Sequence, residues 1–107
     1  MATRRKKIAG DRPNPTWEPD LRELRVGELI VKRFRQPARN QVTVLASFQE
    51  LRWPRRIDDP LTGNSDVEPK RRLRDTVFAL NRNHVTSNVL VFEADGTGTG
   101  IIWKWCC

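Results

Sequence analysis

The feature that most limits the fold of this chain is a basic helical segment followed closely by a glycine-tipped hairpin segment. Residues 69–82 carry apolar side chains at helical spacing, and Pro69 suits the first turn of a helix. Residues 89–105 read as two strands on either side of the glycine-rich stretch 95–100. No proline occurs after residue 69, in keeping with a continuous helix and then paired strands. Any fold must therefore place one cationic helix next to one antiparallel ribbon.

Projected at 100° per residue, the helix has an apolar face and an opposite charged face. The apolar face gathers Leu73, Val77, Leu80 and His84, and the opposite face gathers Arg71, Asp75, Phe78 and Arg82, with Arg74 at its edge. Such a face is either simply solvated or a surface for a polyanion. We predict nucleic-acid contacts from Arg71, Arg74 and Arg82, with Lys70 and Arg72 as flanking phosphate ligands.

Two residues of the charged face are not cations. Asp75 would repel phosphate, but it can accept a hydrogen bond from cytosine or hold Arg71 or Arg82 in place. Phe78 either contacts a thymine methyl group or packs against the hairpin, and we expect packing, because an exposed aromatic ring among arginines is unusual.

The overall charge also favours a polyanionic partner. The chain has 107 residues, a net charge of +7 and a pI near 10.4, and 15 of its 20 cations are arginine. Guanidinium groups suit phosphate and guanine edges, although a GC-rich genome would also raise the arginine content. Four of the six cations in residues 61–107 fall within residues 70–74, so the charge is locally concentrated.

The remainder of the chain is predicted to comprise a tail and the rest of one small domain at residues 17–107. Residues 1–16 lack periodicity and are expected to be a disordered basic tail, in which Arg4, Arg5, Lys6 and Lys7 either bind phosphates or are merely solvated.

Within the domain, residues 21–35 alternate between apolar and polar side chains around a turn at 27–28, which predicts a hairpin. Residues 38–52 predict a helix whose apolar stripe is Val42, Val44, Leu45, Phe48 and Leu51, followed by Trp53 as a core anchor. Residues 55–68 are the least regular, with one short helical turn expected around 58–60, between Ile57 and Leu61, and then a loop at 62–65.

The sequence favours no catalytic, metal or cofactor site. The glycine-rich stretch 95–100 is followed by a strand-like run, whereas phosphate-cradling loops open a helix, so we interpret it as a hairpin tip whose Thr97 and Thr99 could contact phosphate. Asp58 and Asp59 lack the further ligands that a metal-dependent nuclease needs, and His84 lies on an apolar face, where a packed or hydrogen-bonded ring is expected. The adjacent Cys106 and Cys107 are expected to be reduced thiols. We therefore expect no enzymatic activity and no small-molecule ligand.

The order of these segments resembles the winged helix-turn-helix output domain of bacterial response regulators. That family has an N-terminal sheet, three helices of which the third reads the major groove, and a terminal hairpin called the wing. Here residues 69–83 correspond to the recognition helix and residues 89–105 to the wing. The resemblance implies an α+β winged helix-turn-helix with an N-terminal hairpin, two main helices joined by a short middle turn, and a C-terminal hairpin. The chain departs from the family in its shorter N-terminal sheet, its stunted middle helix and its lack of a phosphoacceptor domain, so regulation by phosphorelay does not carry over.

These observations together predict a non-enzymatic protein that binds double-stranded DNA, as a small transcriptional regulator or a nucleoid-associated protein. The alternative is a winged-helix adaptor that docks an acidic protein. Neither a membrane-spanning segment nor the apolar stretch of a secretory signal is evident, which predicts a cytoplasmic or nucleoid location. The resemblance also allows a homodimer, although no coiled coil or evident dimer strand supports one.

Overall fold

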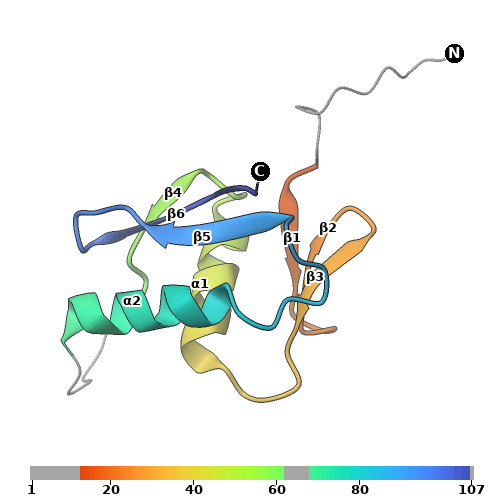
Figure 1. Cartoon of the computed structure of the whole chain (residues 1–107), viewed down its shortest axis with the longest axis horizontal. Helices are drawn as coiled ribbons and strands as arrows, with labels where there is room; N and C mark the ends of the chain where they lie inside the picture. Colours follow the sequence, from red (N-terminus) through yellow and green to blue (C-terminus); the bar gives the residue numbers. More distant parts are fainter. Residues whose placement is uncertain (1–12, 62–67, 107) are drawn as a thin grey trace, which may run out of the picture.

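The computed structural model describes residues 13–61 and 68–106, which form two α-helices and two three-stranded antiparallel sheets (Figure 1). The described residues are therefore a small α+β fold. In chain order the elements are β1 (Pro15–Glu18), β2 (Glu23–Val26), β3 (Leu29–Arg33), α1 (Arg39–Glu50), β4 (Arg56–Asp58), α2 (Pro69–Leu80), β5 (Leu90–Ala94) and β6 (Gly100–Trp105).

The N-terminal sheet has the strand order β1-β2-β3 and contains the predicted hairpin. Gly27 takes a φ of +58° in the turn between β2 and β3, a conformation that glycine adopts at little cost. The predicted boundary of the tail at residue 16 is wrong, because β1 begins at Pro15 and pairs with β2. Pro15 and Trp17 alternate into the core, and a proline is tolerated in an edge strand that does not need its N–H. Residues 1–12, with the tail cations Arg4–Lys7, lie outside the described residues.

The C-terminal sheet has the order β4-β6-β5, so the predicted hairpin is confirmed as β5 and β6 and gains a third strand. The short helical turn expected around residues 58–60 is wrong. Ile57 is buried between two exposed neighbours and pairs with Ile101, because the open edge of β6 accepts a period-two segment there. The strand ends where the Asp59 carboxylate accepts the N–H of Leu61 at 2.8 Å. The predicted loop at 62–65 lies outside the described residues.

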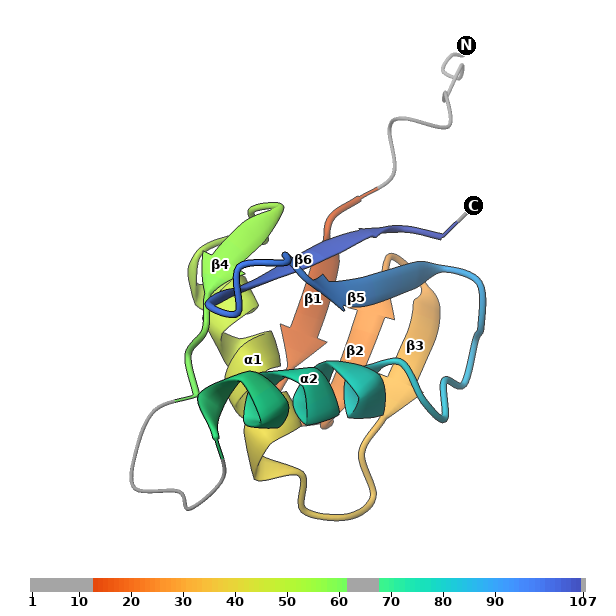
Figure 2. The same ribbon diagram turned by 60° about the vertical axis from the view of Figure 1, so that its left-hand side comes forward.

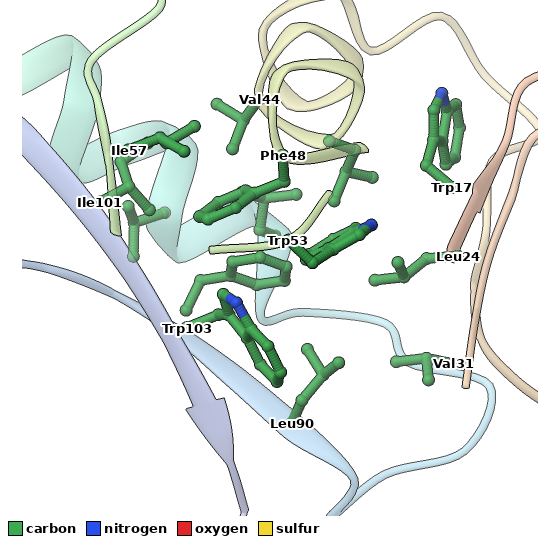
Figure 3. Close-up of a cluster of buried hydrophobic side chains, with 14 of the residues drawn as sticks. Trp17, Leu24, Val31, Val44, Phe48, Trp53, Ile57, Leu90, Ile101 and Trp103 are labelled. Carbon is green, nitrogen blue, oxygen red and sulfur yellow. The ribbon is translucent and has the colours of Figure 1, made fainter. Parts of the chain in front are cut away.

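The core joins both sheets to α1. The predicted stripe is confirmed for Val44, Leu45 and Phe48, which are fully buried, but Leu51 is 60% exposed because α1 ends at Glu50. Trp53 is the expected core anchor and stacks on Phe48, with ring centroids 5.0 Å apart. Trp103 meets Trp53 edge-on at 5.9 Å, and Figure 3 shows these rings at the centre of the apolar cluster. Trp105 is partly buried and packs at the margin of this cluster.

A buried lysine attaches the N-terminal sheet to the end of α2. Lys32 of β3 is 6% exposed, and its Nζ donates to the carbonyl groups of Ala79 and Arg82, each at 2.7 Å. A cation is favourable at this end of a helix, where carbonyl groups lack intrahelical partners. Burial, together with the nearby charge of Arg82, lowers the pKa of Lys32 from 10.5 to about 8, so the amine is still protonated at neutral pH.

Two further polar side chains hold the same end of α2. Asn81 pairs with the backbone of Phe92 in edge strand β5, donating from Nδ2 to the carbonyl at 2.8 Å and accepting the N–H at 2.9 Å. His84 Nε2 lies 2.8 Å from the Leu80 carbonyl, which can only accept, so this nitrogen carries the proton. The expectation of a hydrogen-bonded histidine is confirmed. The C-terminal end of α2 is thus fixed to both sheets.

We predict that Lys32→Met destabilises the protein by about 1–3 kcal/mol, because the carbonyl groups of Ala79 and Arg82 each lose the hydrogen bond from the buried amine. Urea unfolding at pH 7, followed by tryptophan fluorescence, measures this loss. Lys104→Met is the matched control, since Lys104 is exposed and forms an exposed ion pair with Glu93, and it should change stability by less than about 0.5 kcal/mol. Equal stability of Lys32→Met and the wild type would show that the buried amine does not hold the helix.

Candidate nucleic-acid interface

The charged side of α2 points away from the core. Leu73, Val77 and Leu80 bury the opposite side, so the predicted division of the helix into two faces is confirmed. Figure 2 shows α2 in front of α1, with β5 and β6 above it. We call the outward surface the α2 face; its exposed residues are Arg71, Arg74, Asp75, Phe78 and Arg82.

The helix is shorter than predicted, but Arg82 still belongs to this face. α2 ends at Leu80, and Asn81 is its C-cap. The Arg82 guanidinium carbon lies 5.3 Å from the centroid of the Phe78 ring, a distance typical of a cation–π contact. The chain beyond the cap therefore keeps Arg82 next to the exposed end of the helix.

Phe78 does not pack against the hairpin, so that expectation is wrong. The residue is 63% exposed, because the hairpin contacts the flank of α2 that carries Asn81 rather than the outward side. The α2 face therefore has an aromatic ring in its middle.

Most cations on and beside α2 have no carboxylate partner among the described residues. Arg71 Nε lies 3.8 Å from Asp75 Oδ2, and both side chains are about two-thirds exposed, so this pair contributes little. Of the alternatives for Asp75, the pairing with Arg71 is the one observed. Within residues 13–61 and 68–106, Lys70, Arg74 and Arg82 form no ion pair with a carboxylate.

Arg72 differs from its neighbours because it serves the fold. Its side chain is partly buried and donates to the carbonyl of Leu61, which lies a few residues after β4. This bond anchors the first turn of the helix to the segment that follows β4. The guanidinium does not lie on the α2 face, where a flanking phosphate ligand would be needed.

The hairpin tip is held by a network centred on Asp95. The Asp95 carboxylate accepts from the Thr97 hydroxyl at 2.6 Å and its N–H at 2.9 Å, and Thr97 Oγ1 lies 2.8 Å from Thr99 Oγ1. Arg56 of β4 binds the other carboxylate oxygen at 2.6 Å. The hydrogen bonds from Thr97, followed by that from Arg56, lower the pKa of Asp95 to about 2. The two predicted threonine ligands are thus engaged within the tip, next to a carboxylate.

A cation reaches the tip from α2 instead. A Cβ atom built on Gly98 would lie 2.6 Å from Lys70 Cε, so the stem of Lys70 crosses the glycine at close range. Gly98 also has a φ of +86°, which disfavours any other residue. This contact places the side chain of Lys70 between the start of α2 and the hairpin.

A groove borders the other side of α2. It has a volume of about 430 Å³ and lies between the start of α1 and the helix flank carrying Asp75 and Ala79. A second hollow of about 410 Å³, which shares Ala79 with the first, continues it toward β3 and Arg82. Arg35 and Arg39 line these hollows. Sequence reasoning did not select either arginine, because nothing local places residues 35–39 next to a helix forty residues away.

The remaining candidate chemistry takes structural positions. Asp58 pairs with Arg56 at 2.8 Å, and Asp59 closes the turn to Leu61. Cys106 is a free thiol, and Cys107 lies outside the described residues. No three His, Cys, Asp or Glu side chains come together as a possible metal site in the described part of the chain.

Comparisons of the chain with models of known families, with curated proteins and with solved structures gave no match. Neither helix of the described residues has the length and hydropathy required to cross a membrane.

We predict that the contribution of Asp95 to stability is lost between about pH 4 and pH 2. The folded pKa lies below the ordinary value of 3.8, so the unfolded chain takes up the proton first as the pH falls. Urea unfolding of the wild type and of Asp95→Asn should differ most above pH 4 and converge near pH 2. Asp75→Asn is the control, because Asp75 is exposed and only weakly paired. A wild-type advantage over Asp95→Asn that persists unchanged at pH 2 would contradict the prediction.

Proposed function

We propose that this protein binds double-stranded DNA through the α2 face, as a winged-helix-like module without catalytic activity. The observation that carries the proposal is the positive charge on and just beyond α2. Within the described chain, Lys70, Arg74 and Arg82 lack carboxylate partners, and the other side of the helix is buried. Duplex DNA presents one negative charge per roughly 1.7 Å of its axis and a major groove that admits an α-helix.

The surroundings of α2 support a duplex rather than a small anion. The hairpin of β5 and β6 lies on one side of the helix, and the groove carrying Arg35 and Arg39 lies on the other. A helix in the major groove would thus have cations toward the backbone on both sides. The described residues between β4 and α2 contain no middle helix, and the proposal requires only α2 and the hairpin from the winged-helix pattern.

The residues of the interface take distinct roles in this proposal. Arg71, Arg74 and Arg82 face base edges, where bidentate bonds to guanine give specificity. Lys70, Arg35 and Arg39 bind phosphates, together with the tail residues Arg4–Lys7. Arg72, Thr97 and Thr99 are assigned no contact, because the Arg72 guanidinium is partly buried against the Leu61 carbonyl and the two threonine hydroxyls bond within the hairpin tip.

If the interface binds selected sequences, the protein is a small transcriptional regulator. If it binds DNA independently of sequence, the protein is nucleoid-associated. Both roles place it with DNA in the cytoplasm.

The exposure of Phe78 favours a second candidate function, that of a protein–protein adaptor. Aromatic residues and arginine are enriched at protein interfaces, and an exposed ring among cations would suit an acidic partner. Binding to a duplex that weakens with salt separates the two functions, since an adaptor has no such requirement.

We predict that the protein binds a labelled duplex in fluorescence anisotropy, with log K falling linearly against log salt at a slope of about −0.9 per phosphate contacted. Lys70→Ala should reduce the magnitude of this slope by about 1 and weaken all sequences alike. Arg71→Ala should cost about 1–3 kcal/mol on a preferred site and relax sequence preference.

The matched control is Arg52→Asn, which also removes one positive charge. Arg52 is exposed just beyond the C-terminal end of α1. The N-terminal end of this 12-residue helix, which borders the groove, is about 18 Å away. Its φ is +66°, a conformation that asparagine tolerates. If Arg52→Asn weakens binding as much as Lys70→Ala, binding follows net charge and not the α2 face. If no duplex binds at low salt, the DNA-binding proposal is wrong and the adaptor leads.

A further inference from the structure

The α2 face carries one feature that phosphate binding leaves unexplained, the exposed ring of Phe78. Its position on α2 lies one helical turn after Arg74, and the guanidinium of Arg82 stands over the ring at 5.3 Å. The ring is therefore central in the face, between two cations assigned to base edges. The fold does not require a phenylalanine here, because 63% of the residue is exposed and the buried contacts of α2 come from its other side.

If α2 enters the major groove, the chemistry of that groove limits what Phe78 can meet. Adenine, guanine and cytosine present hydrogen-bond donors and acceptors there, and the C5-methyl group of thymine is the one apolar group. Phenylalanine offers neither a donor nor an acceptor. Burying its ring against polar base edges would remove their water without replacing the hydrogen bonds, whereas contact with a methyl group carries no such penalty.

Resting on the proposed function, we propose that Phe78 is a specificity-determining residue that reads a thymine methyl group at the centre of the bound site. The neighbouring arginines determine at which base pairs of the site a guanine is preferred. Arg74 lies four residues away, about 6 Å along the helix, which corresponds to roughly two base pairs. The preferred site accordingly contains a thymine with a guanine within about two base pairs.

The charge of the surface favours duplex DNA over the other partners of an aromatic ring. An acidic protein could cover Phe78, but the cations extend beyond the ring to Lys70 at the hairpin and to Arg39 at the groove. Single-stranded RNA could stack its bases on the ring, and stacking does not depend on the methyl group, because every base has a stacking face. Dependence on the methyl group thus separates the proposal from both.

The test uses a duplex selected by the full-length protein from a randomised pool, and a copy of that duplex with deoxyuridine in place of every thymidine. The copy keeps every base pair and lacks only the methyl groups. The wild type should bind the uracil copy about fourfold more weakly for one buried methyl group. Phe78→Ala should bind both duplexes equally, at about the affinity that the wild type has for the uracil copy.

Two further variants control for effects on the fold. Phe78→Leu keeps an apolar side chain and should retain a preference for the thymine duplex. Leu29→Ala removes another exposed apolar residue, at the start of β3, and should leave both affinities unchanged. Because Phe78 is exposed, Phe78→Ala should melt within a few degrees of the wild type.

The outcomes distinguish this inference from the function on which it rests. Equal wild-type binding to both duplexes, or a selected site without thymine, would overturn the role of Phe78 and leave DNA binding intact. Absence of any duplex binding would overturn both. Tighter binding to single-stranded uracil-containing RNA than to the selected duplex, lost in Phe78→Ala, would replace methyl reading with base stacking.

Discussion

The attachment of α2 depends on a charge placed where charges are seldom found, inside the molecule at the end of a helix. The ammonium group of Lys32 comes from the N-terminal sheet and bonds to the carbonyl of Ala79, in the last turn of α2, and to that of Arg82, just beyond the helix. Asn81 performs the complementary task on the other sheet, pairing with the open backbone of β5. The helix is thus held by bonds to backbone groups, and its outward side chains take no part in holding it. This is why the α2 face can carry arginines and an exposed ring without a cost to the fold.

Two carboxylates elsewhere in the described residues are paired more closely than the one on the α2 face. Glu23 accepts bonds from Arg25 and Arg33, which lower its pKa, and Asp95 is bound by Arg56. On α2 the one carboxylate of the face, Asp75, makes only a long and exposed contact with Arg71. The excess of positive charge on the α2 face therefore reflects the placement of carboxylates as much as that of cations.

The sequence predicted the parts of the fold that depend on local patterns. Helical spacing located both helices, and the glycine-bearing turns located both hairpins. Sequence patterns did not predict the two strands that form because the edge of a neighbouring strand is available. β1 has only four residues with a proline at its start, and β4 has three. Both look irregular in isolation and pair only when β2 and β6 are present. The role of Lys32 was equally hidden, since its bonding partners lie 47 and 50 residues away. The candidate site was predicted in outline, but the exposure of Phe78 and the withdrawal of Arg72 depend on which flank of α2 meets β5 and Leu61.

The hairpin tip has a consequence for how the molecule meets a partner. Arg56 and Thr97 fix Asp95 at the tip, and Asn81 bonds the end of α2 to β5, so the spacing between the hairpin and α2 is set in advance. A surface with a preset spacing leaves the adjustment to its partner. A duplex adjusts by bending and by changing the width of its grooves, and the energy of doing so depends on base steps that the protein never touches. Sequence preference would then extend beyond the contacted bases, to those that make the double helix easy to deform.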